Sequence, residues 1–359
     1  MGSSTELGDR IREARTAMGR TQDEIAAALG VDRSAVARIE VGERKVSALE
    51  LDALGRALGL PLVHFLSRPP AAITSRRRQL AEDTTSTSAT AYRADALLQA
   101  HLRDAEQLRG TGYLRPTGDL PSGTVDSPDA ARALAAAVRE FADLAGPLNG
   151  MCEVAERVGL YILVVDEQIE GSSLTPDHGY GVAVVGGREQ PGRRRFTAAH
   201  EIGHHVLGDE YQADSGVAAS RDERERLIDA FASELLLPRH ELSREWSRSP
   251  GSAFDRLVVI SARYRASWRV AVISAAAEGL VSADEGQALQ RRSPHRGDFV
   301  RLLGISPEPD LVIGETGPRW RQAAVAAYVD GLVSAERAVE LVHGALGIDD
   351  LPEIDEVPV

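Results

Sequence analysis

The sequence has too few cysteines for a disulfide-bonded scaffold, and its apolar runs are too short for a membrane-spanning protein. Its 359 residues include a single cysteine, Cys152, so no disulfide can form within the chain, and a reducing, cytoplasmic location is predicted. No apolar run approaches the roughly 18 residues that span a bilayer, and the N-terminus lacks the layout of a signal peptide. We therefore expect no membrane partner. The net charge of −13 argues against a protein coated with nucleic acid but allows one local DNA-binding face.

What is present is typical of a folded protein of several domains. Hydrophobic residues make up 43% of the chain and charged residues 26%, and the length suits two or more domains. We predict an α+β, predominantly helical fold, in which the β-branched runs Leu160–Asp166 and Gly181–Val185 are the only strands. The predicted divisions are 6–66 (short helices), 67–127 (a Pro-, Arg- and Ser/Thr-rich linker with a helix from Tyr92 to Arg109), 128–291 (mixed) and 292–359 (a helical C-terminal region, interpreted as regulatory from its position alone).

Residues 6–66 have the capping and turn signals of a helix-turn-helix. Thr21 begins the second helix with Glu24 in capping-box position, and Gly30 ends it with a left-handed turn. Asp32 then caps a third helix, Arg33–Glu40. Apolar residues recur at helical spacing in all four helices: Leu7, Ile11, Ala14 and Met18; Ile25 and Leu29; Val36 and Ile39; Leu49, Leu51, Leu54 and Leu58.

The stretch T-Q-D-E-I-A-A-A-L-G-V-D-R-S-A-V-A-R-I-E-V-G-E-R resembles the Cro/repressor-type (XRE) helix-turn-helix family. The resemblance implies a DNA-binding domain whose recognition helix begins at Arg33. Its major-groove residues would be Arg33, Ser34, Ala37 and Arg38, with Gln22 fixing the first turn against phosphate. Paired half-sites would suit a homodimer. The alternative is that these helices dock another protein, since residues 6–56 hold nine basic and ten acidic residues.

The run R-F-T-A-A-H-E-I-G-H-H-V-L-G, residues 195–208, has the spacing of a zinc site. His200 and His204 are four residues apart, so on a helix both imidazoles project from one face, as two ligands of tetrahedral zinc require. Glu201 lies between them and can act as a general base toward a water molecule. His205 lies about 100° around the helix from His204, and we interpret it as a packing residue rather than a ligand.

A third zinc ligand is predicted on a second buried helix, E-R-E-R-L-I-D-A-F-A-S-E-L-L-L-P, residues 223–238. Glu225 and Asp229 are four residues apart and share a face, so one carboxylate can bind zinc while the other accepts a ligating histidine's free ring N–H. Glu223 and Glu234 are the competing carboxylates. By helical spacing, Glu223 faces solvent and Glu234 is a charge on the helix face.

Together these two runs resemble the ImmA/IrrE-type zinc metallopeptidases, which often carry an XRE helix-turn-helix. The lead-in A-A-A-V-R-E-F-A-D-L-A-G-P-L-N-G-M-C-E-V-A-E-R-V-G-L-Y-I-L-V-V extends the resemblance over roughly residues 130–290. It implies a zincin-like domain over 128–291 and a Zn²⁺ site of His200, His204 and Glu225, with Glu201 catalytic and Asp229 beside the ligands. It also implies a substrate, an XRE-type repressor cut to derepress stress or mobile-element genes. One departure is Ile228, where the family often has Ala.

Three points stay open at the level of sequence. The chain could instead be a non-catalytic DNA-binding regulator that uses zinc structurally or as a sensor, or a peptidase that grips a protein partner with its N-terminal helices. An oxyanion stabiliser is needed, and Tyr180, His178 and Tyr211 are candidates without an assignment. The run Gly179–Val185 is either an edge strand that accepts an extended substrate or a buried core strand.

Overall fold

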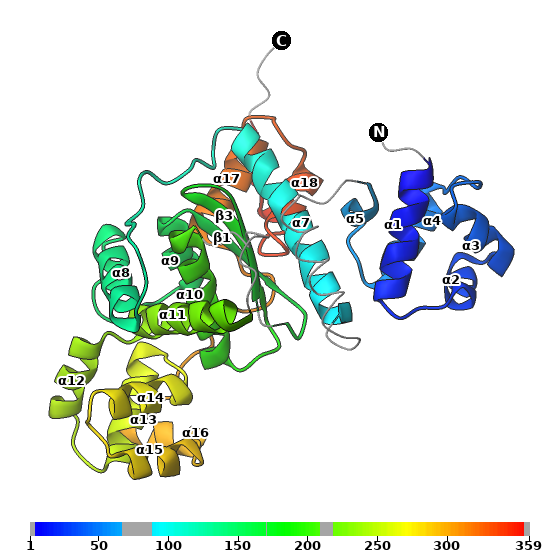
Figure 1. Cartoon of the computed structure of the whole chain (residues 1–359). Helices are drawn as coiled ribbons and strands as arrows, with labels where there is room; N and C mark the ends of the chain where they lie inside the picture. The colour runs from blue at the N-terminus through cyan, green and yellow to red at the C-terminus, as the bar shows by residue number, and fades with distance from the viewer. Residues whose placement is uncertain (1–3, 67–87, 170, 209–217, 355–359) are drawn as a thin grey trace. The chain divides into compact units, whose positions relative to one another are not determined.

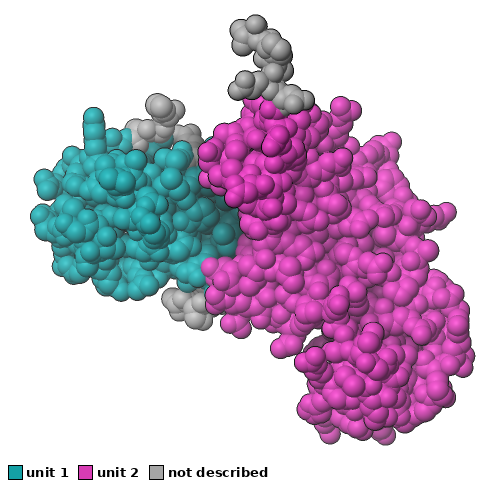
Figure 2. Space-filling view, turned by 180° about the vertical axis from the view of Figure 1, so that it is seen from behind, with its two compact units in different colours: residues 1–104, 211–213 teal, residues 105–210, 214–359 magenta. Residues whose placement is uncertain are grey.

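The computed structural model describes residues 4–66, 88–169, 171–208 and 218–354. These residues divide into two units, and the division falls after residue 104, inside the helix α7 (Ser88–Gly110), which contains the predicted helix from Tyr92 to Arg109 (Figures 1 and 2). Helices dominate both units, and one three-stranded sheet lies in the second. The predicted α+β, predominantly helical class is therefore confirmed. Among the described helices, none is both long enough and apolar enough to cross a membrane.

The first unit begins with the predicted helix-turn-helix. Its helices are α1 (Ser4–Ala17), α2 (Gln22–Leu29), α3 (Arg33–Glu40), α4 (Ala48–Leu58) and α5 (Val63–Leu66). Thr21 and Glu24 form a reciprocal capping box at the start of α2, and Gly30 ends that helix at a φ of 67°. The side chain of Asp32 caps α3 by accepting the Ala35 N–H. The turn between α2 and α3 is thus fixed by the residues from which it was predicted.

The apolar faces of these helices meet in one core. Its buried members include Ile11, Ala14, Ile25, Val36, Ile39, Leu51, Leu54 and Leu58, joined by Tyr92 from α7. Gly8 brings α1 close to α3, because a Cβ at this position would lie 2.4 Å from the Ile39 carbonyl oxygen. The predicted apolar positions are confirmed with one exception. Leu49 lies in α4 but is 82% exposed, because it is two residues before Leu51 and so lies about 200° around the helix from it.

The sheet of the second unit has strand order β1-β3-β2. Its strands are β1 (Leu160–Val165), β2 (Gly171–Asp177) and β3 (Tyr180–Gly186), with β1 parallel and β2 antiparallel to β3. β1 and β3 were predicted, whereas β2 was not. The run G-S-S-L-T-P-D lacks β-branched and aromatic residues apart from one Thr and includes a proline, which only an edge strand tolerates easily.

The two faces of the sheet carry different layers. On one face, Ile162 and Ala183 pack into a core that includes α8 (Pro128–Phe141), α9 (Met151–Arg157), α10 (Pro191–Leu207) and α11 (Ala218–Leu236). On the other face, Tyr161 lies between Tyr180 and Trp320, the latter from α17 (Pro318–Val329). Figure 1 shows α10 and α11 on one side of the strands and α17 on the other.

Residues near the C-terminus of the described chain complete this sheet and its helices. Gly314 and Glu315 form backbone hydrogen bonds with Val164, along the side of β1 that faces away from β3. The Glu156 carboxylate accepts the backbone N–H groups of Arg319 and Trp320 at the start of α17. Burial raises the pKa of this carboxyl to about 7, although those N–H groups act to lower it. The last elements, α18 (Ala335–Leu341) and a short 3₁₀ helix (Ile348–Asp350), follow α17.

A separate cluster of helices lies between α11 and this C-terminal segment. It contains α12 (Arg239–Arg248), α13 (Ala253–Tyr264), α14 (Trp268–Ala277), α15 (Ala283–Gln290) and α16 (Arg296–Leu303), and it has its own apolar core (Figure 1). Residues of α13 and α14 form much of this core, and Phe299 and Leu302 of α16 pack against it. The predicted domain boundaries, including the one after residue 291, stay predictions.

Candidate metal centre

The helix α10 carries the histidine motif, and a glycine in it sets how closely α11 approaches. Pro191 begins α10 and Gly208 ends it at a φ of 59°. A Cβ on Gly203 would lie 3.0 Å from side-chain atoms of both Ile228 and Phe231 on α11. The absence of a side chain at residue 203 therefore lets the two helices pack closely. Ile228, the residue that departs from the family pattern, is itself buried at this contact.

The close packing brings His200, His204 and Glu225 together. One ligand-type atom from each of the three lies within 4.8 Å of the others. The two Nε2 atoms are 3.1 Å apart, and Glu225 Oε2 lies 3.1 Å from His200 Nε2. Tetrahedral zinc, with bonds of about 2.0–2.1 Å to nitrogen and oxygen, holds its ligand atoms about 3.3 Å from one another. The donor set and its spacing therefore fit a zinc-sized divalent ion.

Asp229 lies against the far side of the His200 ring, one turn along α11 from Glu225. Its Oδ1 is 3.0 Å from His200 Nδ1, so this ring nitrogen can donate to the carboxylate while Nε2 faces the other two groups. Burial acts to lower the pKa of His200, but hydrogen bonds to Asp229 and Glu225 and the charge of Glu201 outweigh it and raise this pKa to about 10. The site thus favours positive charge at the point where the three groups meet.

Glu201 lies on α10 next to this group and is 6% exposed. It accepts a hydrogen bond of 2.5 Å at Oε2 from the Ser173 hydroxyl of β2. Sequence reasoning missed Ser173, because β2 itself was not predicted. The alternation of side chains along a strand would have placed it on the α10 side once β2 was known.

His205 has a structural environment, as predicted. Its ring is buried between the hydroxyl of Thr175, which donates to Nδ1, and the carbonyl of Val158, which accepts from Nε2. Burial lowers the pKa of His205 to about 4, so the ring is neutral near pH 7. His205 therefore joins α10 to β2 and to the end of α9.

The other candidates for the site lie away from the three converging groups. Glu223 is exposed, whereas Glu234, predicted to be a charge on the helix face, is partly buried and accepts the Arg239 N–H at the start of α12. Tyr180 is buried on the sheet face opposite α10, and His178 is exposed in the turn after β2. Tyr211 lies outside the described residues. No oxyanion donor is assigned among these side chains.

The order of the strands decides whether Gly179–Val185 is an edge strand or a buried core strand. β3 lies at the centre of the sheet and all its residues are buried, so this run is a core strand and not an edge. The edge position next to α10 belongs to β2. An extended peptide added to the sheet on this side would therefore pair with β2.

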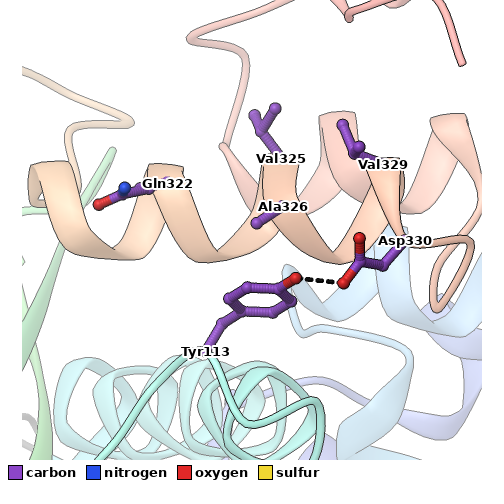
Figure 3. Close-up of a pocket in the computed structure, with 6 residues that line it drawn as sticks. All are labelled: Tyr113, Gln322, Val325, Ala326, Val329 and Asp330. Atoms are coloured by element: carbon purple, nitrogen blue, oxygen red, sulfur yellow. Dashed lines mark hydrogen bonds between the residues drawn. The ribbon is translucent and has the colours of Figure 1, made fainter.

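A hollow on α17 lies apart from this centre. It measures about 380 Å³ and is lined by Gln322, Val325, Ala326, Val329, Asp330 and the side chain of Tyr113, which donates a hydrogen bond to Asp330 (Figure 3). None of these residues belongs to the metal centre, and the hollow has no metal-ligating cluster among the described residues.

The residues predicted to contact DNA lie on the outer side of α2 and α3. Arg33, Ser34 and Arg38 are exposed, and Ala37 is half-buried. The amide of Gln22 donates to the buried carboxylate of Glu40, which also pairs with Arg15. Gln22 is thereby held at the first turn of α2.

Two family models match the chain. Residues 11–65 match a helix-turn-helix family, and residues 155–274 match the IrrE N-terminal-like domain, a peptidase family. The chain carries a helix-turn-helix DNA-binding domain followed by an IrrE-like peptidase domain. The IrrE-like match includes all three strands, α10 and α11, and so every residue of the candidate metal centre. Among curated proteins, none matches the chain.

Proposed function

We propose that the chain is a zinc-dependent endopeptidase that cleaves an XRE-type transcriptional repressor and thereby derepresses stress or mobile-element genes. The observation that carries the proposal is the convergence of His200 and His204 of α10 with Glu225 of α11. Glu201 lies beside the two histidines on α10. Two imidazoles and one carboxylate leave a fourth tetrahedral position open, as in catalytic zinc sites, whereas structural zinc usually has four protein ligands.

The residues around this position suit peptide hydrolysis. A bound zinc ion would polarise the peptide carbonyl and an attacking water molecule as a Lewis acid. Glu201 would take a proton from this water and return it to the leaving amine. Asp229 would hold the His200 ring in the tautomer whose Nε2 faces the site. The half-exposed edge strand β2 offers main-chain groups that can align an extended segment of substrate.

The proposed substrate class rests on the ImmA/IrrE resemblance and on the chain's own XRE-type domain. The test is to incubate the purified, zinc-loaded chain with purified XRE-type repressors encoded by neighbouring genes. We expect discrete fragments of one repressor, loss of cleavage after chelation, and recovery when zinc is restored. Cleavage that persists after complete removal of the metal would exclude a metallopeptidase. Absence of cleavage for every repressor would favour the non-catalytic regulator.

We also propose that Gln22, Arg33, Ser34, Ala37 and Arg38 form the DNA-contacting surface, and that two chains bind paired half-sites as a homodimer. The exposure of the α3 side chains supports this assignment. Arg33→Ala should weaken binding of the full chain to its operator by about 5- to 150-fold, since a bidentate arginine–guanine contact is worth about 1–3 kcal/mol. Electrophoretic mobility shifts against operators altered at single bases measure this. An equal loss on all sequences would make Arg33 a phosphate contact instead.

A further inference from the structure

A stripe of small and polar residues on β2 faces the histidine helix. Gly171 and Ser173 alternate along the strand and so share one face. Thr175, at a register irregularity between Leu174 and Asp177, contacts His205 of α10 from the same face. Ser173 pairs in register with Ala183 of β3, which belongs to the core shared with Ala198 and other residues of α10. The stripe therefore lies on the α10 side of the sheet, at its edge strand.

Two residues of this stripe enclose the carboxylate of Glu201. The Ser173 hydroxyl donates to Oε2 at 2.5 Å. A Cβ at residue 171 would lie 2.5 Å from the Thr197 methyl and 2.7 Å from Oε1, so a side chain here would displace this oxygen from its position. One carboxylate oxygen is thus tethered and the other is accommodated by the absence of a side chain. No metal ligand takes part in either contact.

We propose that Ser173 is a positioning residue that holds the Glu201 carboxylate in the orientation needed to accept a proton from the attacking water. This inference rests on the proposed role of Glu201 as the base. A glutamate has three rotatable side-chain bonds, and a misplacement of about 1 Å in a catalytic group can cost about 100-fold in rate. The tether uses one lone pair of Oε2 and leaves the remaining lone pairs of the carboxylate for the proton.

The position of β2 gives the tether a second consequence. An extended substrate peptide would pair with β2, because β2 is the edge strand of the sheet. The same strand carries Ser173, which holds Glu201, the proposed base. A displacement of β2 would therefore move the substrate backbone and the Glu201 carboxylate together. The substrate backbone and the carboxylate would then keep their relative geometry.

The test compares Ser173→Thr with Ser173→Val, which have nearly the same shape and differ in the hydroxyl. On the repressor that the native chain cleaves, Ser173→Thr should keep kcat within about 3-fold, whereas Ser173→Val and Ser173→Ala should lower kcat by about 10-fold or more, since a hydrogen bond to a charged group is lost. KM and zinc content should change by less than about 2-fold, because no ligand or strand backbone is altered. Ser172→Ala, on the opposite sheet face, is the matched hydroxyl deletion and should keep kcat.

Binding of N-acetyl-leucine hydroxamate to the zinc-loaded protein provides a readout that needs no turnover. The two oxygens of the hydroxamate chelate the metal, and its acidic proton can be accepted by an oriented carboxylate. Calorimetry should show binding weakened about 5-fold or more by Ser173→Val and not by Ser173→Thr. If the native chain cleaves no repressor but this difference is found, the positioning role holds and the proposed function fails. If the native chain cleaves while the Val and Thr variants behave alike in both assays, Ser173 has no positioning role.

Discussion

Glu201→Gln should lower the rate of repressor cleavage by about 1000-fold while leaving about one zinc ion bound per chain. The substitution keeps the size of the side chain, and its remaining carbonyl oxygen can still accept the Ser173 hydrogen bond. An amide cannot take a proton from water, however, and general base catalysis is typically worth 10²- to 10⁴-fold. Single-turnover cleavage and metal content by atomic emission are the measurements. A variant that cleaves at the native rate would remove Glu201 as the base.

The matched controls for this result lie on α11. Glu225→Ala should lose zinc under mild chelation, because the remaining two histidines are too few ligands for a stable site. Glu223→Ala, two residues earlier and exposed, should retain zinc as the native protein does. If Glu223→Ala loses the metal and Glu225→Ala keeps it, the ligand assignment on α11 is wrong, whatever the behaviour of Glu201→Gln.

Much of the candidate metal centre follows from helical spacing in the sequence. An interval of four residues places His200 above His204, and the same interval places Glu225 with Asp229. The structure brings the two pairs together, with Asp229 on the His200 ring as the pattern suggested. Spacing within each helix could not say how the helices meet. That depends on Gly203, whose missing side chain admits Ile228 and Phe231 of α11.

Elements without a strong periodic pattern could not be predicted in this way. β2 is half-exposed and four of its seven residues are Gly, Ser or Pro, so its conformation depends on pairing with β3 and not on propensity. Ser173 was missed for the same reason. The contribution of the C-terminal residues was also hidden, because it consists of single contacts made across long sequence separations. Glu156 with the start of α17 is one such contact, and Asp310 with Arg195 is another.

Asp310→Ala should lower the free energy of unfolding of the second unit by about 3–5 kcal/mol. Arg195 lies on α10, is 1% exposed and forms an ion pair with Asp310, which also accepts the backbone N–H of Met151. Removing the carboxylate leaves a guanidinium charge buried, with the carbonyl groups of Leu148 and Asn149 as its hydrogen-bond partners among the described residues. The thermal midpoint should fall by about 10 °C, at roughly 2–4 °C per kcal/mol for a unit of this size.

Two further variants test whether the loss of stability comes from the buried, unpaired charge of Arg195 or from the loss of any ion pair. Asp166→Ala breaks an ion pair in which the side chains of Asp166 and Arg188 are 57% and 59% exposed. It should lower the free energy of unfolding by less than about 1 kcal/mol, because solvent screens the charges. The double variant Arg195→Met with Asp310→Leu should recover most of the stability that Asp310→Ala loses, since it removes the buried charge together with its partner. If Asp310→Ala costs no more than Asp166→Ala, the buried pair does not hold α10 to the segment that follows α16. α10 carries His200, Glu201 and His204. If Asp310→Ala lowers stability as expected, Asp310, which lies beyond the matched residues 155–274, is needed to stabilise the helix of the candidate metal centre.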